Sequence, residues 1–306
     1  MALPNRRCDT PAALFRIVRQ EGRTYGDHND RMILNVCCPA KINLFLAVGP
    51  RDEVGYHPLR TIFQTIDLRD DVVIDLDATE TSVEFTWQVV PENNTVTKAI
   101  RLMAEFTDLP RMGIKILKRI PTMAGLGGGS ANAAAVIRAV RHLVPERFSE
   151  RDAFAVAEAV GADVPFFLVG GKALGEGYGE KLTPLPDPKP LKWVLVVKPP
   201  YSYSTPDMFA KLDAISYHFE EFPTTERQHN DFERVICYGN DVIERISVFG
   251  GSKAGMTGSG SAMFGLFDSK QEAKQAEGYV KSEDLGDTWV VQMMSREDSL
   301  LIWPEE

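Results

Sequence analysis

The sequence contains few cysteines and histidines, and neither residue type is clustered. The four cysteines among 306 residues form no C-x-x-C pair, and the five histidines show no spacing typical of metal ligands. Cys37 and Cys38 are adjacent in a strand-like stretch, where neighbouring side chains point to opposite faces. We therefore interpret both as small hydrophobes of a strand, not as a disulfide or a metal site. So few unpaired cysteines favour a reducing compartment.

Long apolar runs are also missing from the sequence. No stretch approaches the roughly 20 apolar residues of a membrane-spanning helix, and the N-terminus lacks the charged-then-apolar pattern of a secretory signal. Residues 1–30 hold five arginines, but also four acidic residues and no serine, which argues against an organelle transit peptide. We expect residues 1–31 to be an N-terminal extension, either disordered or a short helix. These absences predict a cytoplasmic protein with no membrane partner.

Basic residues are outnumbered in this chain. There are 34 Lys and Arg against 43 Asp and Glu, which gives a formal net charge of -9. Because phosphate-backbone contacts need clustered Lys and Arg, the charge argues against a nucleic-acid partner. The apolar fraction of 44% is ordinary for a globular protein and supplies enough material for a full core.

Strand-like and helix-like hydrophobic patterns are mixed along the chain. Apolar alternation or β-branched runs predict strands at 32–48 with a break at Pro39, 59–68, 71–76, 82–90, 112–120, 193–197, 262–267 and 288–294. Helical spacing predicts helices at 94–106, 130–144, 149–160, 207–212, 232–249 and 270–281. Hairpins together with crossovers predict an α+β fold. The proline-rich stretch at 184–190 predicts a boundary between domains 32–186 and 187–306.

The most informative segment is a glycine-rich loop between a predicted strand and an alanine-rich helix. Four of the five residues at 125–129 are glycines. Glycines let backbone N–H groups approach an anion closely, and the first N–H groups of the following helix lack partners within the helix. The segment therefore predicts a phosphate-binding site.

Two better-known phosphate loops do not fit this segment. It lacks the G-x-x-x-x-G-K-[ST] pattern of a Walker A loop. It is also a poor Rossmann fingerprint, because Ser130 stands three residues beyond Gly127, where that pattern has a glycine. Ser130 begins the helix, so its hydroxyl is free to cap the helix or to face a phosphate or a metal ion.

A second loop of small residues spans Gly255–Ser261 and precedes an apolar strand. Such a string is as consistent with a tight interdomain turn as with a second backbone clamp on phosphates. The residues that would form the clamp are Thr257, Gly258, Ser259 and Gly260.

Three polar residues in apolar surroundings form a candidate acid–base set. Lys41 and Asn43 alternate along a strand and so share one face, where both could also be solvated. Asp163 lies in the apolar stretch GADVPFFL and needs a partner for its charge, either a structural ion pair or a catalytic cation. A Lys–Asp pair next to a phosphate loop is the minimum for phosphoryl transfer to an alcohol.

Three separated strings resemble the motifs of the GHMP kinase superfamily. PAKINLFL resembles the first motif, PTMAGLGGGSANAA the second and AGMTGSGSAMFGLF the third, in matching order and spacing. Within the superfamily, Gly55-Tyr56-His57 and GADVPFFLVGGKALGEGYGEKL resemble the kinases whose substrate carries a cytidine diphosphate group. The resemblance runs from about Val36 to about Leu266. One departure is Ala131, where many relatives have a second serine, so the metal ligands stay open with Ser130 as one candidate.

The resemblance implies a fold, a reaction and ligands. The fold would have two lobes with the active site in the cleft between them. The enzyme would be an ATP-dependent phosphotransferase with an alcohol as acceptor, using Mg2+. It would phosphorylate the 2-hydroxyl of 4-diphosphocytidyl-2-C-methyl-D-erythritol in the non-mevalonate isoprenoid pathway. The protein would act as a monomer or a homodimer.

The resemblance also implies a role for each matched position. Lys41 and Asp163 would be the catalytic pair. The ATP phosphates would be wrapped by Pro121, Thr122, Met123, Ala124, Gly125, Leu126, Gly127, Gly128, Gly129, Ser130 and Ala131. Tyr56 would stack on the cytosine and His57 would hydrogen-bond its edge. The full set of implied substrate-binding residues is Asn43, Tyr56, His57 and Phe209.

Three different functions also fit parts of the sequence. The chain could be another GHMP kinase, acting on homoserine, mevalonate or a sugar. It could be a nucleotide-binding protein without catalysis, although Lys41 and Asp163 are both present. A Rossmann oxidoreductase would require NAD binding.

Overall fold

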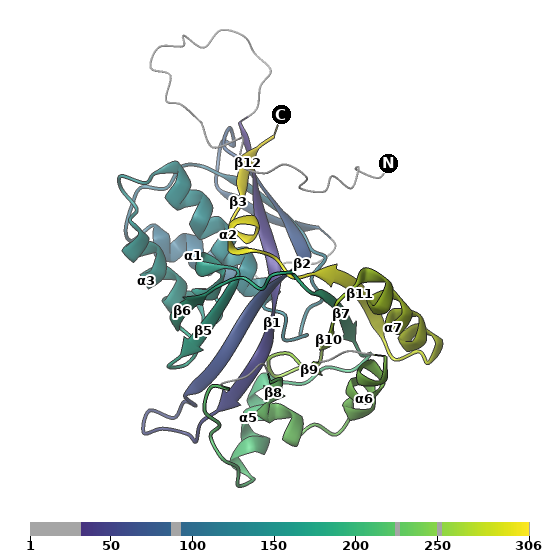
Figure 1. Cartoon of the computed structure of the whole chain (residues 1–306). Coiled ribbons are helices and arrows are strands. Elements are labelled where there is room, and N and C mark those ends of the chain that lie inside the picture. Colours follow the sequence, from purple (N-terminus) through teal and green to yellow (C-terminus); the bar gives the residue numbers. More distant parts are fainter. Residues whose placement is uncertain (1–31, 87–92, 224–226, 250–252, 306) are drawn as a thin grey trace. The chain divides into compact units, whose positions relative to one another are not determined.

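Two β-sheets with helices packed against them carry the fold, as seen in a computed structural model (Figure 1). The structure describes residues 32–86, 93–223, 227–249 and 253–305, which belong to one compact unit. The expected N-terminal extension, residues 1–31, lies outside the described residues, as does the end of the predicted strand 82–90. Among the helices of the described ranges, none is long and apolar enough to cross a membrane.

The first sheet is centred on two long antiparallel strands, β1 (Ile33–Val48) and β2 (Leu59–Asp75). Its strands run in the order β12-β1-β2-β4-β3, with β5 and β6 attached to β2 and β8 attached to β1. The remaining strands of this sheet are β3 (Ser82–Thr86), β4 (Gly113–Leu117), β5 (Lys172–Glu176), β6 (Lys181–Leu185), β8 (His229–Asn230) and β12 (Ile302–Pro304).

The second sheet is antiparallel and is built from the later part of the chain. Its strands run in the order β11-β7-β10-β9. They are β7 (Trp193–Lys198), β9 (Ala254–Met256), β10 (Met263–Phe267) and β11 (Asp287–Gln292). The two sheets meet where Ile66 of β2 bridges to Met293. Within the described residues the pairing is antiparallel except between β3 and β4 and between β1 and β8, which are parallel. Mainly antiparallel sheets with helices packed against them are the α+β architecture that the sequence predicts.

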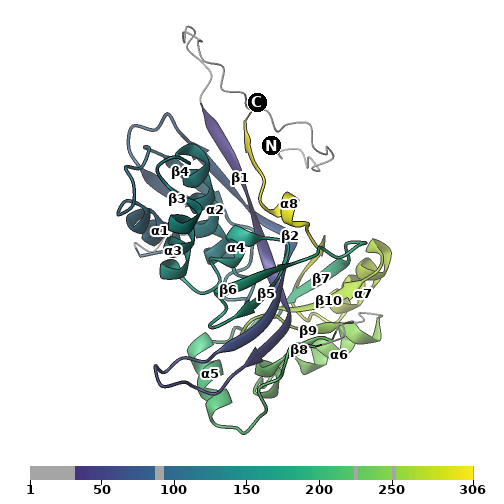
Figure 2. The same cartoon turned by 60° about the vertical axis from the view of Figure 1, so that its left-hand side comes forward.

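The helices divide between the two sheets (Figure 2). α1 (Thr95–Met103), α2 (Gly128–Leu143) and α3 (Glu150–Val160) pack together beside the first sheet, and α2 contacts β1. Helices α6 (Asn240–Val248) and α7 (Lys270–Ser282) pack against the second sheet. The other helical segments are α4 (Phe166–Val169), α5 (Thr205–Asp213), η1 (Asp231–Arg234) and α8 (Arg296–Ser299).

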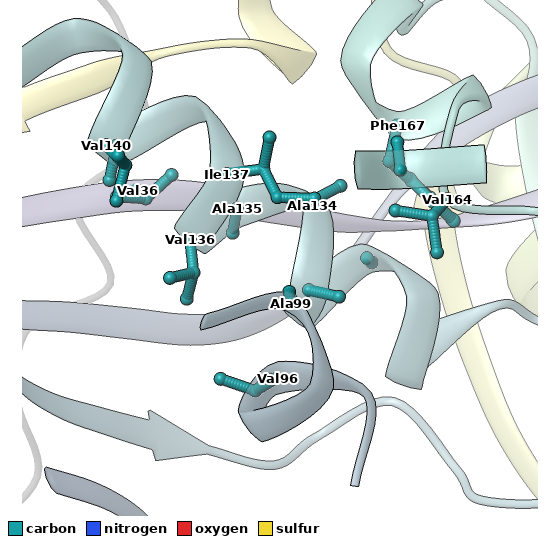
Figure 3. Packing of buried hydrophobic residues seen from close by; sticks show 14 of the residues in the cluster. Val36, Val96, Ala99, Ala134, Ala135, Val136, Ile137, Val140, Val164 and Phe167 are labelled. Carbon is teal, nitrogen blue, oxygen red and sulfur yellow. The ribbon is translucent and has the colours of Figure 1, made fainter. Parts of the chain in front are cut away.

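Helix α2 lies deep in the core because most of its residues are small. Its alanines at 131, 133, 134, 135 and 139 are buried, so the helix approaches β1 and α1 closely. Figure 3 shows Ala134, Ile137 and Val140 of α2 in one cluster with Val96 of α1 and Val36 of β1. This packing fixes the position of the first turn of α2, where the glycine-rich loop ends.

Two predicted strand breaks were wrong. The sequence predicts an interruption at Pro39 and separate strands at 59–68 and 71–76, but β1 and β2 each run through. The register shifts instead, because Pro39 pairs with Arg69 while Ala40 pairs with Ile66. Proline cannot donate a ladder hydrogen bond, and a bulge that leaves residues 67–68 unpaired accommodates it without ending the strand.

The predicted helix 232–249 was also wrong as one piece. The chain forms η1 and α6, separated by a turn that ends at Gly239 in the left-handed region, with φ 107°. The helix starts predicted at 94 and 149 are confirmed. Asn94 and Ser149 cap α1 and α3 through capping boxes. The domain boundary near 187 stays a prediction.

Replacing Ile137 by alanine tests the packing of α2. Ile137 is fully buried in the α1–α2–β1 cluster, so Ile137→Ala should lower the free energy of unfolding by about 2–5 kcal/mol. Urea denaturation followed by circular dichroism measures this change. Val248→Ala is the control, because Val248 is 80% exposed; equal losses in both variants would contradict the assignment of α2 to the core.

Candidate active site

A buried lysine and a partly exposed aspartate meet beside the glycine-rich loop. Lys41 Nζ on β1 lies 3.5 Å from Asp163 Oδ2. It also donates a 2.8 Å hydrogen bond to Asn43 Oδ1, two residues further along the same face of the strand. The ring of Phe63 lies beneath the ammonium group, with its centroid 5.7 Å from Nζ. Lys41 is thus held in one orientation by three neighbours.

Asp163 comes from the short turn between α3 and α4. Helix α3 ends at Gly161, and Val164 N–H donates back to the Gly161 carbonyl. The Asp163 side chain is 37% exposed, whereas that of Lys41 is 3% exposed. The carboxylate can therefore meet a ligand from outside while the cation stays beneath it.

The amide of Asn43 ties Lys41 to two other segments. Its Oδ1 accepts from Lys41 Nζ and from the backbone N–H of Gly258, both at 2.8 Å. Its Nδ2 donates to Thr61 Oγ1 on β2 at 2.8 Å. The expected role of Asn43 in orienting substrate stays a prediction; the structure places the amide in a buried network that fixes the lysine.

The glycine-rich loop lies directly against Lys41. Gly127 is the N-cap of α2, in the left-handed region with φ 73°, and has no side chain to cap the helix. A Cβ at Gly127 would lie 2.8 Å from the Phe167 ring and 3.2 Å from Lys41 Cγ. The first N–H groups of α2 are therefore left for an external acceptor beside the lysine stem.

The second small-residue loop is locked onto the glycine-rich loop. Thr257 is fully buried, and its hydroxyl oxygen lies 3.2 Å from the Gly125 carbonyl oxygen and 3.1 Å from Asn43 Oδ1. Ala262 N–H donates to the Ala124 carbonyl at 3.1 Å. Thr257 thus joins the two loops, and its expected part in ATP binding stays a prediction, as do those of Gly258, Ser259 and Gly260.

The expected ATP-binding residues differ in accessibility. Thr122, Met123 and Gly129 are exposed and Ser130 is half-buried, while Ala124, Leu126 and Ala131 are buried. Thr122 and Met123 precede α2 in the chain, and Gly129 lies in its first turn.

The residues expected to bind the base lie in the loop that joins β1 to β2 and on α5. His57 and Phe209 are in stacked contact, with ring centroids 4.8 Å apart. His57 is 7% exposed, its Nδ1 lies 2.9 Å from the Gly49 carbonyl oxygen, and its Nε2 lies 3.4 Å from Asp213 Oδ1. Tyr56 on the same loop is 63% exposed. The imidazole faces protein oxygens, and the neighbouring tyrosine faces outward.

One buried network was missed in the sequence. Asp70 Oδ1 accepts from the N–H groups of Arg119 and Ile120 at 2.7 and 2.8 Å. Its Oδ2 contacts Lys118 Nζ and accepts from Asn132 Nδ2 at 2.8 Å. The network joins the chain entering the glycine-rich loop to the helix leaving it. No signal of this network is visible in the sequence, because Asp70 stands in a charged stretch with Asp67, Arg69 and Asp71.

A second missed feature is the string Asn230-Asp231-Phe232-Glu233. Phe232 lies in a hydrophobic cluster with residues of the second sheet. In addition, Asn230 Nδ2 donates to the carbonyls of Met256 and Gly258 at 2.8 and 2.9 Å. The string therefore also supports the second small-residue loop.

Replacing Gly125 by alanine tests the contact between the loops. Its φ is 73°, and an added Cβ would lie 2.1 Å from the Thr257 carbonyl oxygen, so the loops would have to separate. We expect Gly125→Ala to weaken ATP binding at least tenfold in calorimetric titration. Gly278→Ala is the matched control, because nothing lies within 4 Å of its Cβ position on α7. Wild-type affinity in Gly125→Ala would refute the loop contact.

Comparisons with known proteins show which family the chain resembles. Residues 94–171 match the GHMP kinases N terminal domain, and residues 240–284 match the GHMP kinases C terminal family. A 4-diphosphocytidyl-2-C-methyl-D-erythritol kinase of Acetivibrio thermocellus is 40% identical over 266 residues, covering 80% of this chain and 94% of the relative. A kinase of the same name from Alkaliphilus oremlandii is 35% identical over 263 residues, covering 78% and 89%.

Solved structures give the same answer at the level of the fold. A crystal structure of a 4-(cytidine 5'-diphospho)-2C-methyl-D-erythritol kinase matches with a TM-score of 0.71 and 32% identity, covering 85% of this chain and 98% of that one. The homoserine kinase from Cytophaga hutchinsonii matches with a TM-score of 0.65 at 18% identity, covering 93% and 100%, which shows the fold alone. Identity of 40% over nearly the full length of a relative, together with the Lys41–Asp163 pair against the glycine-rich loop, means that this chain belongs to the 4-diphosphocytidyl-2-C-methyl-D-erythritol kinase family of the GHMP kinases.

Proposed function

We propose that this protein transfers the γ-phosphate of ATP to the 2-hydroxyl of 4-diphosphocytidyl-2-C-methyl-D-erythritol, a step of the non-mevalonate isoprenoid pathway. The observation that carries the proposal is the contact of Lys41 with both Asp163 and the glycine-rich loop. This is the pair of charges that phosphoryl transfer to an alcohol needs, next to a loop built for phosphates.

The triphosphate would bind at the start of α2. Unpaired N–H groups and the helix dipole both favour anionic oxygens there. The stem of Lys41 passes beside Gly127, so its ammonium group would neutralise charge on the transferring phosphoryl group. The loop contacts through Thr257 and Asn43 hold this arrangement before ATP arrives, which reduces the cost of ordering it.

Asp163 would accept the proton of the substrate hydroxyl. As the hydroxyl oxygen forms its bond to the γ-phosphorus, the bond from that phosphorus to the bridging oxygen breaks and its electron pair leaves with ADP. The proton passes to Asp163 Oδ1 or Oδ2. Lys41 donates to Asn43 Oδ1 and contacts Asp163 Oδ2, so its side chain stays directed at the place where the phosphoryl group would pass.

Mg2+ fits the site as an ion carried by the nucleotide. Within the described ranges, no three His, Cys, Asp or Glu side chains gather as a metal site. Mg2+ commonly keeps waters and phosphate oxygens with only one or two protein oxygens. Ser130, which is half-buried in the first turn of α2, is the residue that would supply one of them. When bound, the ion neutralises negative charge on adjacent phosphates.

The cytidine base would be recognised at Tyr56, His57 and Phe209. The stack of buried His57 on half-buried Phe209 holds these two rings in place, and the exposed Tyr56 ring offers a face for stacking. Base–aromatic stacking contributes about 1–3 kcal/mol. Homoserine, mevalonate and sugars carry no base, so a kinase for any of them would need no such aromatic site.

The predicted cytoplasmic location, the monomer or homodimer and the absence of a nucleic-acid partner remain predictions from the sequence. A catalytically silent protein is disfavoured by the ion pair, because Lys41 and Asp163 are in contact and Asp163 is accessible.

Replacing Asp163 by alanine tests the proton acceptor. Asp163→Ala should keep ATP binding but lower kcat about 10²- to 10⁴-fold, the usual contribution of a positioned general base. A coupled assay of ADP release with the cytidyl substrate measures kcat, and titration calorimetry measures ATP binding. Asp108→Ala, at an exposed aspartate outside the site, is the control. Near-normal turnover in Asp163→Ala would refute the base assignment.

The acceptor is tested with a panel of alcohols. The cytidyl substrate should be phosphorylated with a far higher kcat/KM than homoserine, mevalonate or a hexose, and CDP should compete with it. Equal rates on homoserine, or no inhibition by CDP, would favour another GHMP kinase.

A further inference from the structure

Two connecting segments meet beside the proposed base site. The loop at 49–58 joins β1 to β2, and the turn at 177–180 joins β5 to β6. Strand β5 pairs with β2, and Leu59 N–H donates to the Gly177 carbonyl at 2.7 Å, so the two connections lie side by side. The first carries Tyr56 and His57, and the second carries Tyr178.

Asp52 fixes the conformation of the loop that carries Tyr56. Its Oδ1 accepts from the N–H groups of Val54 and Tyr56 at 3.0 and 2.9 Å. Its backbone N–H donates to the Tyr56 carbonyl at 2.8 Å, and its carbonyl accepts from Gly55 N–H at 3.0 Å. Asp52 thus fixes the conformation of residues 52–56 through its Oδ1, its backbone N–H and its carbonyl.

Tyr178 holds the remaining oxygen of that carboxylate. Its hydroxyl donates to Asp52 Oδ2 at 2.7 Å, and its ring contacts the Tyr56 ring, with centroids 5.4 Å apart. Tyr178 is itself anchored, because its backbone N–H donates to Glu180 Oε2 at 2.6 Å. A single side chain therefore braces both the backbone and the ring of Tyr56 from the neighbouring hairpin.

The ionisation states suit this contact. The hydrogen bond from Tyr178 lowers the pKa of Asp52, and the same bond raises the pKa of Tyr178. Near neutral pH the carboxylate is therefore charged and the phenol protonated, which are the forms that a charge-assisted hydrogen bond needs.

Both rings of the pair remain partly open to solvent. Tyr56 is 63% and Tyr178 is 37% exposed, so neither ring contributes mainly to the core. Holding two exposed aromatic side chains in one arrangement costs conformational entropy. That cost is recovered when a ligand binds, because the side chains no longer have to be ordered at that moment.

We propose that Asp52 and Tyr178 are positioning residues that set the Tyr56 ring for stacking on the cytosine of the substrate. The proposal rests on the proposed function, because it assumes a cytidyl substrate at Tyr56. It assigns no chemical step to either residue. Their loss should raise the KM for the cytidyl substrate and leave the chemistry and the ATP site unchanged.

Removing the Tyr178 hydroxyl tests this role. Tyr178→Phe keeps the ring but loses the bond to Asp52, so the KM for the cytidyl substrate and the Kd for CDP should rise about 3- to 10-fold. The kcat and the KM for ATP should stay within about twofold of the wild type. Asp52→Asn keeps an acceptor for Val54 and Tyr56 and loses the charge, and it should give a smaller rise in the same KM.

Tyr279→Phe is the matched control. The Tyr279 hydroxyl on α7 accepts from Arg245 Nη1 at 3.0 Å, so this variant also loses a hydrogen bond to a charged partner, away from the loop at 49–58. It should leave all kinetic constants unchanged. The double variant Tyr178→Phe/Asp52→Asn should raise the KM by less than the product of the single effects, because both changes remove one contact.

The outcomes separate the two proposals. Wild-type protein that does not phosphorylate the cytidyl substrate would defeat the proposed function. Wild-type activity on that substrate, with an unchanged KM in Tyr178→Phe, would defeat the positioning role alone. A fall in kcat, or an equal rise in the KM for ATP, would also overturn it, because the effect would then be a general loss of structure.

Discussion

The amide of Asn43 is the contact on which the arrangement of the site depends. Its oxygen accepts from the ammonium group of Lys41 and from the N–H of Gly258, and its nitrogen donates to Thr61. One side chain thus connects the lysine, the second small-residue loop and the neighbouring strand. In the buried surroundings of β1, these hydrogen bonds are stronger than they would be in water, and a missing partner would leave a buried polar group unsatisfied. That network fixes the orientation of the Lys41 side chain toward Asp163.

Close packing between the two loops is the second constraint. The backbone of Gly125 touches that of Thr257 so closely that no side chain fits between them. The glycines therefore serve two purposes, since they free N–H groups at the start of α2 and also let the loops touch. The alanines of α2 act at a longer range, because they let the helix lie against β1 and so fix where its first turn points.

The phosphate-binding end and the base-binding end of the proposed site are built differently. The phosphate end relies on backbone groups and buried polar side chains, which need no rearrangement when a ligand arrives. The base end combines the stack of His57 on the half-buried Phe209 with an exposed tyrosine pair held by Asp52. Lys41 and Asn43 lie on β1, and Tyr56 and His57 lie in the loop that follows it. The strand therefore sets the distance between the phosphate end and the base end of the site.

The sequence alone determined the α+β class, the helix starts at Asn94 and Ser149, the glycine-rich loop and the candidate pair, because each depends on local spacing and residue type. Tertiary structure decided how they combine. It converted the break expected at Pro39 into a bulge, it joined Lys41 to Asp163 from distant parts of the chain, and it showed Tyr178 bracing Tyr56. These contacts link residues from different elements, and no local pattern encodes which distant side chains meet once the two sheets pack.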